Sequence, residues 1–196
     1  MLTAETAAAW LHAFAEKINE NKAYLSELDS AIGDGDHGSN LARGVQAMEE
    51  KLQAGGLETV QDVLKTAAMA LIGKVGGASG PLYGSALIAM AKQAGEDEKD
   101  VASIVKAGLD GIQKRGKAEK GEKTMVDVWV PVCEALKSGA LTKEVIQNAV
   151  DGTKEMKATK GRASYLGERS VGHLDPGAVS SGYLFEALLE GGILDE

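Results

Sequence analysis

The segment "AIGDGDHGSN" (residues 31–40) decides between two fold classes for this chain. Its glycines match the pattern G-x-G-x-x-G, which in a dinucleotide-binding fold follows a strand and opens a helix. The residues before the segment instead repeat with the spacing of one helix face. They are Leu11, Phe14, Ile18, Leu25 and Leu28. Because a helix pattern stands where the strand should be, we exclude the dinucleotide-binding fold and expect helices on both sides of the loop.

Apolar residues keep a helical period along the rest of the chain. The further periodic stretches are 41–52, 58–73, 82–94, 98–114, 124–138, 142–157 and 177–190. The stretch 125–132 contains β-branched residues, but its apolar positions also fit a helix, which we favour. Asp175 followed by Pro176 is typical of a helix start, and Ser39 or Asn40 can cap the helix after the loop. The sequence therefore predicts an all-α fold of about eight amphipathic helices in one domain, residues 1–196.

The composition excludes several classes of function. A formal net charge of −8 argues against nucleic-acid binding through a basic face. A single cysteine, Cys133, excludes an internal disulfide and fits a reducing cytoplasm, where we expect the protein to reside. We find no signal peptide at the N-terminus and no apolar run near the ~18 residues that a membrane span requires, so we expect no membrane association.

Three carboxylates fall within eight residues of the loop: Asp29, Asp34 and Asp36. In an extended Gly-Asp-Gly-Asp segment the second and fourth side chains point the same way, and Asp29 at the helix end can join them. Such a cluster favours a hard cation, Mg²⁺ or Ca²⁺, because all its ligands are oxygens. Mg²⁺ would in turn bind phosphate, which explains an acidic loop in a phosphate-binding pattern. The alternative is a solvated acidic turn, since Gly-Asp is a common turn former.

Three other glycine-bearing loops carry polar residues. The loop 73–86 can approach a phosphate closely through its small residues and Ser79, or it is a flexible connection. The loop 116–124 resembles a P-loop, but the residue after Gly121 is Glu122 and no strand precedes the loop, so we reject that motif. The lysine and threonine of this loop, near a helix start, either contact a phosphate or are solvated. The loop 161–178 is either functional or disordered; its Arg162 can pair with phosphate, and Asp175 can serve only as a cap.

Four motifs together resemble one known family. They are "LDSAIGDGDHGSN" (28–40), "GGASGPLYG" (76–84), "GEKTMVD" (121–127) and "GRASYLGERSVGHLDPGA" (161–178). In this order they resemble the nucleotide-binding L subunits of bacterial phosphoenolpyruvate-dependent dihydroxyacetone kinases, over nearly the whole chain. The resemblance implies a barrel of eight antiparallel helices with the nucleotide in loops at one end.

The resemblance also implies the ligand set. Two Mg²⁺ ions would bridge Asp29, Asp34 and Asp36 to the phosphates of ADP or ATP. The implied nucleotide-contacting residues are His37, Gly38, Ser39, Asn40, Ala78, Ser79, Gly116, Met125, Arg162, Asp175, Pro176 and Gly177. No residue of the chain is evident as a base for the substrate hydroxyl, so we expect a partner to supply it.

Members of this family work with partner subunits. A phosphohistidine on an M subunit phosphorylates the retained ADP, and the ATP formed passes its phosphoryl group to dihydroxyacetone on a K subunit. Some relatives also contact a transcription regulator. Two alternatives stay open: a kinase subunit that exchanges ATP, and a non-catalytic nucleotide- or lipid-binding regulator of the same fold. The aspartate triad argues against the non-catalytic alternative, because a pure binding protein has no need of three convergent carboxylates.

Overall fold

The computed structural model of the chain describes residues 1–195, and this part consists of helices, turns and loops without strands. The helices are α1 (Ala4–Ile32), α2 (His37–Gln53), α3 (Val60–Lys74), α4 (Ser79–Glu96), α5 (Val101–Gly116), α6 (Val126–Lys137), α7 (Lys143–Gly152) and α8 (Pro176–Glu190), with a 3-10 helix, η1 (Arg162–Ser170), before α8. The all-α prediction is confirmed, and the stretch 125–132 is helical. In the described chain, none of the helices is both long and apolar enough to cross a bilayer.

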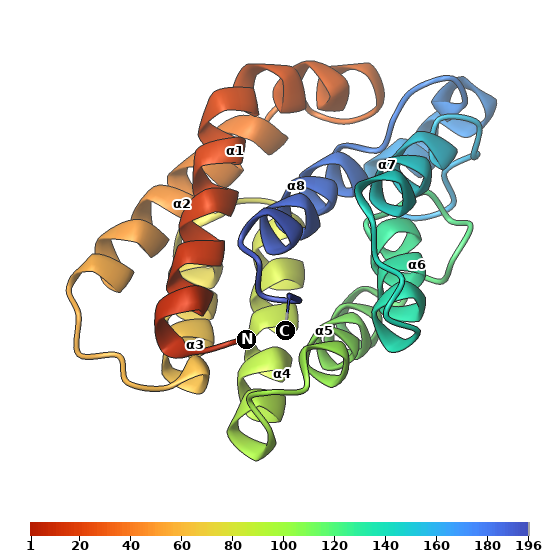
Figure 1. Cartoon of the computed structure of the whole chain (residues 1–196). Coiled ribbons are helices and arrows are strands. Elements are labelled where there is room, and N and C mark those ends of the chain that lie inside the picture. The colour runs from red at the N-terminus through yellow and green to blue at the C-terminus, as the bar shows by residue number, and fades with distance from the viewer. Residues whose placement is uncertain (196) are drawn as a thin grey trace.

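The eight α-helices pack in a closed cyclic order (Figure 1). Each contacts the next one along the chain, and α8 returns to pack against α1. This is the order of neighbours that a helical barrel would have. This order places the two ends of the sequence next to each other. The amino group of Met1 donates to the carbonyl oxygen of Ile193 at 2.8 Å.

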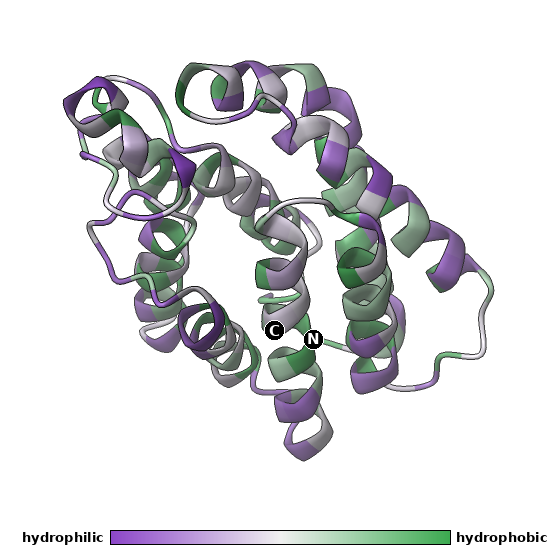
Figure 2. Ribbon diagram, turned by 180° about the vertical axis from the view of Figure 1, so that it is seen from behind, coloured by the Kyte–Doolittle hydropathy of each residue, from purple (hydrophilic) through white to green (hydrophobic). Residues whose placement is uncertain are grey.

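Apolar side chains fill the space between the helices, and the apolar helix faces turn inward (Figure 2). Five of the largest fully buried side chains are aromatic: Trp10, Phe14, Tyr83, Trp129 and Phe185. The rings of Trp129 and Phe185 meet edge to face at 4.8 Å between centroids, a favourable geometry for aromatic pairs. A cavity among these side chains measures about 10 Å³, which is room for about one water molecule. The interior therefore offers no lipid-sized space at this position.

Side-chain caps begin most of the helices. Five of them accept a hydrogen bond from a backbone N–H of the first turn: Thr3, Thr59, Asp100, Thr142 and Asp175. The predicted start of the last helix is thus confirmed, with Pro176 in its first position.

Several predicted boundaries are wrong, and α4, for example, begins at Ser79, inside the predicted loop 73–86. The helix α2 begins at His37, so the proposed caps Ser39 and Asn40 lie inside it, and Asp36 at the cap position makes no side-chain cap bond. This leaves the Asp36 carboxylate available for other contacts. The helix α7 ends at Gly152 rather than near 157, because the following residues turn toward the site described below.

Candidate functional site

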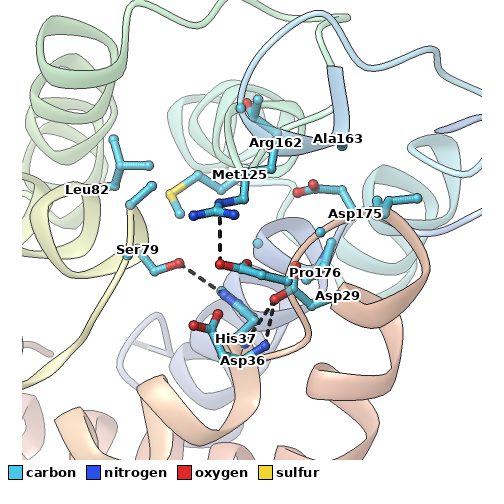
Figure 3. Close-up of a pocket in the computed structure, with 18 of the residues that line it drawn as sticks. Asp29, Asp36, His37, Ser79, Leu82, Met125, Arg162, Ala163, Asp175 and Pro176 are labelled. Atoms are coloured by element: carbon cyan, nitrogen blue, oxygen red, sulfur yellow. Dashed lines mark hydrogen bonds and ion pairs between the residues drawn. The ribbon is translucent and has the colours of Figure 1, made fainter. Parts of the chain in front are cut away.

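A pocket of about 200 Å³ opens where the glycine-bearing loops meet (Figure 3). Its lining comes from the loop before α2, the start of α4, the start of α6, the start of η1 and the start of α8. The four loops singled out in the sequence are therefore brought together at one site. Twelve of the fifteen candidate residues line this pocket: Asp29, Asp34, Asp36, His37, Asn40, Ala78, Ser79, Met125, Arg162, Asp175, Pro176 and Gly177.

The three aspartates converge at the floor of the pocket. Each of Asp29, Asp34 and Asp36 offers a carboxylate oxygen, and these oxygens all lie within 4.8 Å of one another. The segment is not extended as expected, because Gly35 adopts a φ of +78°, a conformation that glycine accommodates without strain. A turn at Gly35, rather than strand alternation, therefore brings the carboxylates together.

Asp29 fixes the shape of this turn. Its Oδ2 accepts the backbone N–H groups of Asp36 at 3.0 Å and His37 at 3.1 Å (Figure 3). Partial burial raises the pKa of Asp29, the two N–H groups lower it, and the charges of Asp34 and Asp36 raise it further. The cluster thus concentrates negative charge that the protein itself compensates only in part.

The donor set fits a hard cation. All three groups are carboxylates, and Mg²⁺ binds oxygen at about 2.0–2.1 Å, so two ligands across one ion lie at most about 4.2 Å apart. The observed limit of 4.8 Å is close to that span, and a small side-chain rotation closes the difference. Arg162 adds a positive charge to the pocket, where its Nε lies 3.3 Å from Oδ2 of Asp34.

His37 is held on both sides of its ring. Its Nδ1 lies 3.0 Å from Oγ of Ser79, and its Nε2 lies 2.9 Å from Oγ of Ser180. Burial lowers the pKa of His37 to about 4, against a small opposing effect of Asp36, so the imidazole is neutral. It therefore cannot serve as a cation for phosphate, and its contact with a ligand would pass through Ser79.

Two predicted nucleotide contacts, Gly38 and Ser39, do not line the pocket and instead contact α1. Gly38 packs against α1, where a Cβ atom would collide with the carbonyl oxygen of Lys22. The backbone N–H of Ser39 donates to Oγ of Ser26 at 3.3 Å, and its hydroxyl donates to the carbonyl oxygen of Asp36 at 3.1 Å. Neither residue lines the pocket, because the start of α2 needs both for its packing on α1.

A second pocket of about 510 Å³ adjoins the first and contains the remaining candidate, Gly116. The two pockets share lining residues Gly77, Ala78, Leu82, Thr124, Met125, Lys160 and Gly161. Its further walls include the apolar side chains of Pro81, Ile112 and Val126. The site therefore has an acidic half and an apolar half, which suits a ligand with a charged tail and a flat apolar ring.

Lys123 has a role that the sequence did not indicate. Lys123 stands in the P-loop-like stretch and lines the pocket, but the residue is only 1% exposed, so it is not a solvated loop lysine. Its Nζ donates to the carbonyl oxygens of Thr153 at 2.7 Å, Lys154 at 3.3 Å and Met156 at 3.1 Å, and also to that of His173. One ammonium group thus ties the turn after α7 to the segment before α8.

Asp175 combines the two roles considered for it. Its Oδ2 accepts the N–H of Ala178 at 2.8 Å as the cap of α8, and it also lines the pocket. Burial raises its pKa to about 7, the N–H of Ala178 and the charge of Lys123 lower it, and other carboxylates raise it. Its own N–H donates to Oγ1 of Thr153 at 3.1 Å, which joins it to the same turn that Lys123 holds.

The raised pKa of Asp175 makes stability depend on pH. Between its ordinary value of 3.8 and about 7, the folded chain keeps a proton that the unfolded chain releases. The contribution of this group is complete below the lower value and is lost as the pH rises through the upper one. Asp175→Asn is neutral throughout and still caps the helix. In EDTA, we expect urea unfolding to show similar midpoints for both proteins at about pH 4 and a lower midpoint for the parent above about pH 7. Parallel profiles would contradict this expectation.

The geometry defines a helical protein with a two-lobed acidic and apolar site, and comparison with known proteins gives its family. The model of the DAK2 domain matches residues 31–190, and the chain belongs to this family.

Three of the similar curated proteins are subunits of nearly the same length as this chain. The PTS-dependent dihydroxyacetone kinase, ADP-binding subunit DhaL, of Lactococcus lactis subsp. lactis is 55% identical over 97% of this chain and 98% of its own. The PEP-dependent dihydroxyacetone kinase 1, ADP-binding subunit DhaL, of Listeria innocua is 53% identical over 92% of this chain and 93% of its own. The PEP-dependent dihydroxyacetone kinase, ADP-binding subunit DhaL, of Escherichia coli is 41% identical over 91% of this chain and 92% of its own.

Solved structures share the fold. The dihydroxyacetone kinase of C. freundii matches with a TM-score of 0.76 and 24% identity, over 94% of this chain and 34% of that chain. The same kinase in complex with AMP-PNP and Mg²⁺ matches with a TM-score of 0.74. This chain spans about a third of that kinase. The likeness confirms the predicted fold class.

Proposed function

We propose that the chain is the ADP-binding subunit of a phosphoenolpyruvate-dependent dihydroxyacetone kinase, built as one nucleotide-binding domain. The observation that carries the proposal is the convergence of Asp29, Asp34 and Asp36 beside a pocket formed by four loops. The end-to-end similarity to subunits bearing this name supports it. The proposed partners are a K subunit that holds dihydroxyacetone and an M subunit that carries a phosphohistidine.

The two halves of the site divide the work of binding. The three aspartates would hold Mg²⁺, two ions by the family resemblance, against the phosphates of ADP. Bound Mg²⁺ would neutralise the charge that develops on the transferred phosphoryl group. Ala78, Gly116 and Met125 line the apolar half, which would take the adenosine. Arg162 would exchange its contact with Asp34 for a phosphate oxygen.

The residues of this chain bind and orient, and they leave proton transfer to a partner. Phosphoryl transfer depends mainly on positioning and charge neutralisation. His37 lines the pocket, but both its ring nitrogens are already engaged by hydroxyl groups, so it is not free to accept a proton from a substrate alcohol. We therefore assign the base for dihydroxyacetone to the K subunit.

An ATP-exchanging kinase subunit is the second candidate, because longer relatives also match. Triokinase/FMN cyclase of Mus musculus is 40% identical over 85% of this chain, which covers 31% of that protein. Both candidates predict that ADP and Mg²⁺ bind here, and they differ in whether the nucleotide leaves.

Native mass spectrometry of the purified, dialysed protein tests the proposal. We expect a mass increase that equals one ADP and its Mg²⁺, and turnover of dihydroxyacetone that requires the phosphorylated M subunit. Nucleotide-free protein that turns over ATP with only the K subunit would support the exchanging candidate. Protein that binds neither ADP nor ATP in the presence of Mg²⁺ would refute both.

Arg162→Ala is expected to lower ADP affinity about 10- to 100-fold, the value of charge-assisted hydrogen bonds to one phosphate. Its pair with Asp34 joins side chains that are 70% and 41% exposed, so its loss costs at most about 1 kcal/mol of stability. Calorimetry with Mg–ADP and thermal unfolding of nucleotide-free protein separate the two effects. Arg169→Ala, an exposed position that does not line the pocket, is the control. Equal losses of affinity in both variants would contradict a specific role for Arg162.

A further inference from the structure

A continuous chain of hydrogen-bonding side chains runs from the pocket into the apolar core. It passes from Ser79 through His37, Ser180, Tyr83 and Ser181 to Trp129. The distances are 3.0 Å from Ser79 to His37, 2.9 Å to Ser180, 2.6 Å to Tyr83, 3.0 Å to Ser181 and 3.1 Å from there to Trp129. Four helices contribute to it, and every member except Ser79 is buried. The core of the molecule thus has a direct polar connection to the site.

The inner half of the chain has one direction. The indole N–H of Trp129 can only donate, so Ser181 accepts from it. The hydroxyl of Ser181 has one further recorded partner, the hydroxyl of Tyr83, so giving every hydroxyl proton an acceptor requires Ser181 to donate to Tyr83 and Tyr83 to donate to Ser180 at 2.6 Å. In this fully satisfied network Ser180 receives a proton from the core side, and its own single proton goes elsewhere.

Ser180 is the branch point of the chain. Its proton can go to the carbonyl oxygen of Gly177 at 3.2 Å or to Nε2 of His37 at 2.9 Å. In the first arrangement, Nε2 of His37 carries the ring proton and donates to Ser180, and Ser79 donates to Nδ1. In the second arrangement, Nδ1 of His37 carries the proton and donates to Ser79, which frees the Ser79 hydroxyl proton for the pocket.

The two arrangements suit different states of the site. The first satisfies all six contacts, including the one to Gly177, and so fits the pocket without a ligand. It also turns an unprotonated oxygen of Ser79 toward the pocket, where a phosphate oxygen would be repelled. The second gives up the longest of the six contacts, to Gly177, and presents a hydroxyl proton to an anion instead.

We propose that binding of the nucleotide phosphate reverses this chain, so that the ring proton of His37 moves from Nε2 to Nδ1 and Ser79 becomes a donor to the phosphate. The inference rests on the proposed function for the identity of the anion. His37, Ser180 and Tyr83 are then positioning residues that act through Ser79. Both forms of His37 are neutral, so the change is one of tautomer and not of charge.

Nitrogen-15 NMR of histidine-labelled protein reads the tautomer directly, because a protonated and an unprotonated ring nitrogen have different shifts. The chain has three histidines, and the variants His12→Asn and His173→Asn assign the signals of His37 by elimination. We expect a proton on Nε2 in nucleotide-free protein and on Nδ1 after addition of Mg–ADP. The same tautomer in both states would overturn the inference.

Ser79→Ala breaks the connection to the ligand without touching the inner chain. We expect this variant to bind Mg–ADP about tenfold or more weakly, as for a lost charge-assisted hydrogen bond, and to keep Nε2 of His37 protonated even when saturated. Ser85→Ala, on the same helix and outside the chain of contacts, should show the tautomer change of the parent protein. A tautomer change in saturated Ser79→Ala would also overturn the inference.

The same titrations separate the inference from the function it rests on. Calorimetry on the labelled sample shows whether Mg–ADP binds at all, and absence of binding would count against the proposed function. Binding with an unchanged His37 would count against the inference alone.

Discussion

Asp36→Asn should lower the affinity for Mg–ADP by about 100-fold or more while the nucleotide-free protein unfolds at the same temperature. The Asp36 carboxylate makes no cap bond to α2, and its charge repels that of Asp29, so removing the charge takes no stabilising contact from the fold. Changes to groups that merely support metal ligands already cost about 10- to 100-fold in metal affinity, and a direct ligand should cost at least as much. Isothermal titration with Mg–ADP and thermal unfolding in EDTA measure the two quantities.

Two comparisons give this result its meaning. Asp110→Asn removes the same charge from an exposed position on α5, and we expect it to leave ADP affinity unchanged. Asp29→Asn should differ from Asp36→Asn, because Asp29 also holds the turn through the N–H groups of Asp36 and His37. If Asp36→Asn binds Mg–ADP as tightly as the parent protein, the carboxylates do not form a metal site.

Lys123→Met should destabilise the protein by about 3 kcal/mol or more. The change keeps an apolar stem of similar length but leaves the carbonyl oxygens of Thr153, Met156 and His173 without their shared donor. The carbonyl of Thr153 is buried, and a buried acceptor left unsatisfied costs about 1–3 kcal/mol, to which the partly buried carbonyls of Met156 and His173 add smaller amounts. Urea unfolding of the nucleotide-free protein measures the loss. We also expect weaker ADP binding, since Lys123 holds the segment that presents Asp175.

Lys120→Met, at an exposed position of the same loop, is the matched control and should stay within about 0.5 kcal/mol of the parent protein. A similar small change in Lys123→Met would show that the carbonyl groups find other donors. A loss of ADP binding at full stability would assign Lys123 directly to the ligand.

The sequence predicted the fold class well because helical periodicity is a local signal. The spacing of Leu11, Phe14 and Ile18 reflects burial on one face, and the structure buries all three. The start of α8 at Asp175 and Pro176 could be predicted for the same reason, because a capping side chain and a proline act within one helical turn. The aspartate cluster, Ser79 and Arg162 were predicted from the residues themselves, the full set of pocket residues came from the family resemblance, and the structure adds that loops far apart in the chain meet around them.

What the sequence could not predict depends on long-range contacts or on backbone conformation. The sequence around Lys123 does not indicate that its ammonium group would donate to four carbonyl groups from residues 153–173. The positive φ of Gly35 was missed, since glycine is compatible with both extended and turned backbone. Gly38 and Ser39 were assigned to the nucleotide by position in a motif, whereas their contacts with α1 become visible only once the two helices are packed.

The span of the pocket along the chain, from Asp29 to Gly177, has a consequence for synthesis. A nascent polypeptide that has left the ribosome only as far as α7 contains the carboxylates and the walls from α4 and α6, but lacks the wall formed by Arg162 and the start of α8. The complete pocket can therefore form only when translation is nearly finished. In the cell, the nucleotide would act as a late folding checkpoint that stabilises complete chains and gives truncated ones no such protection.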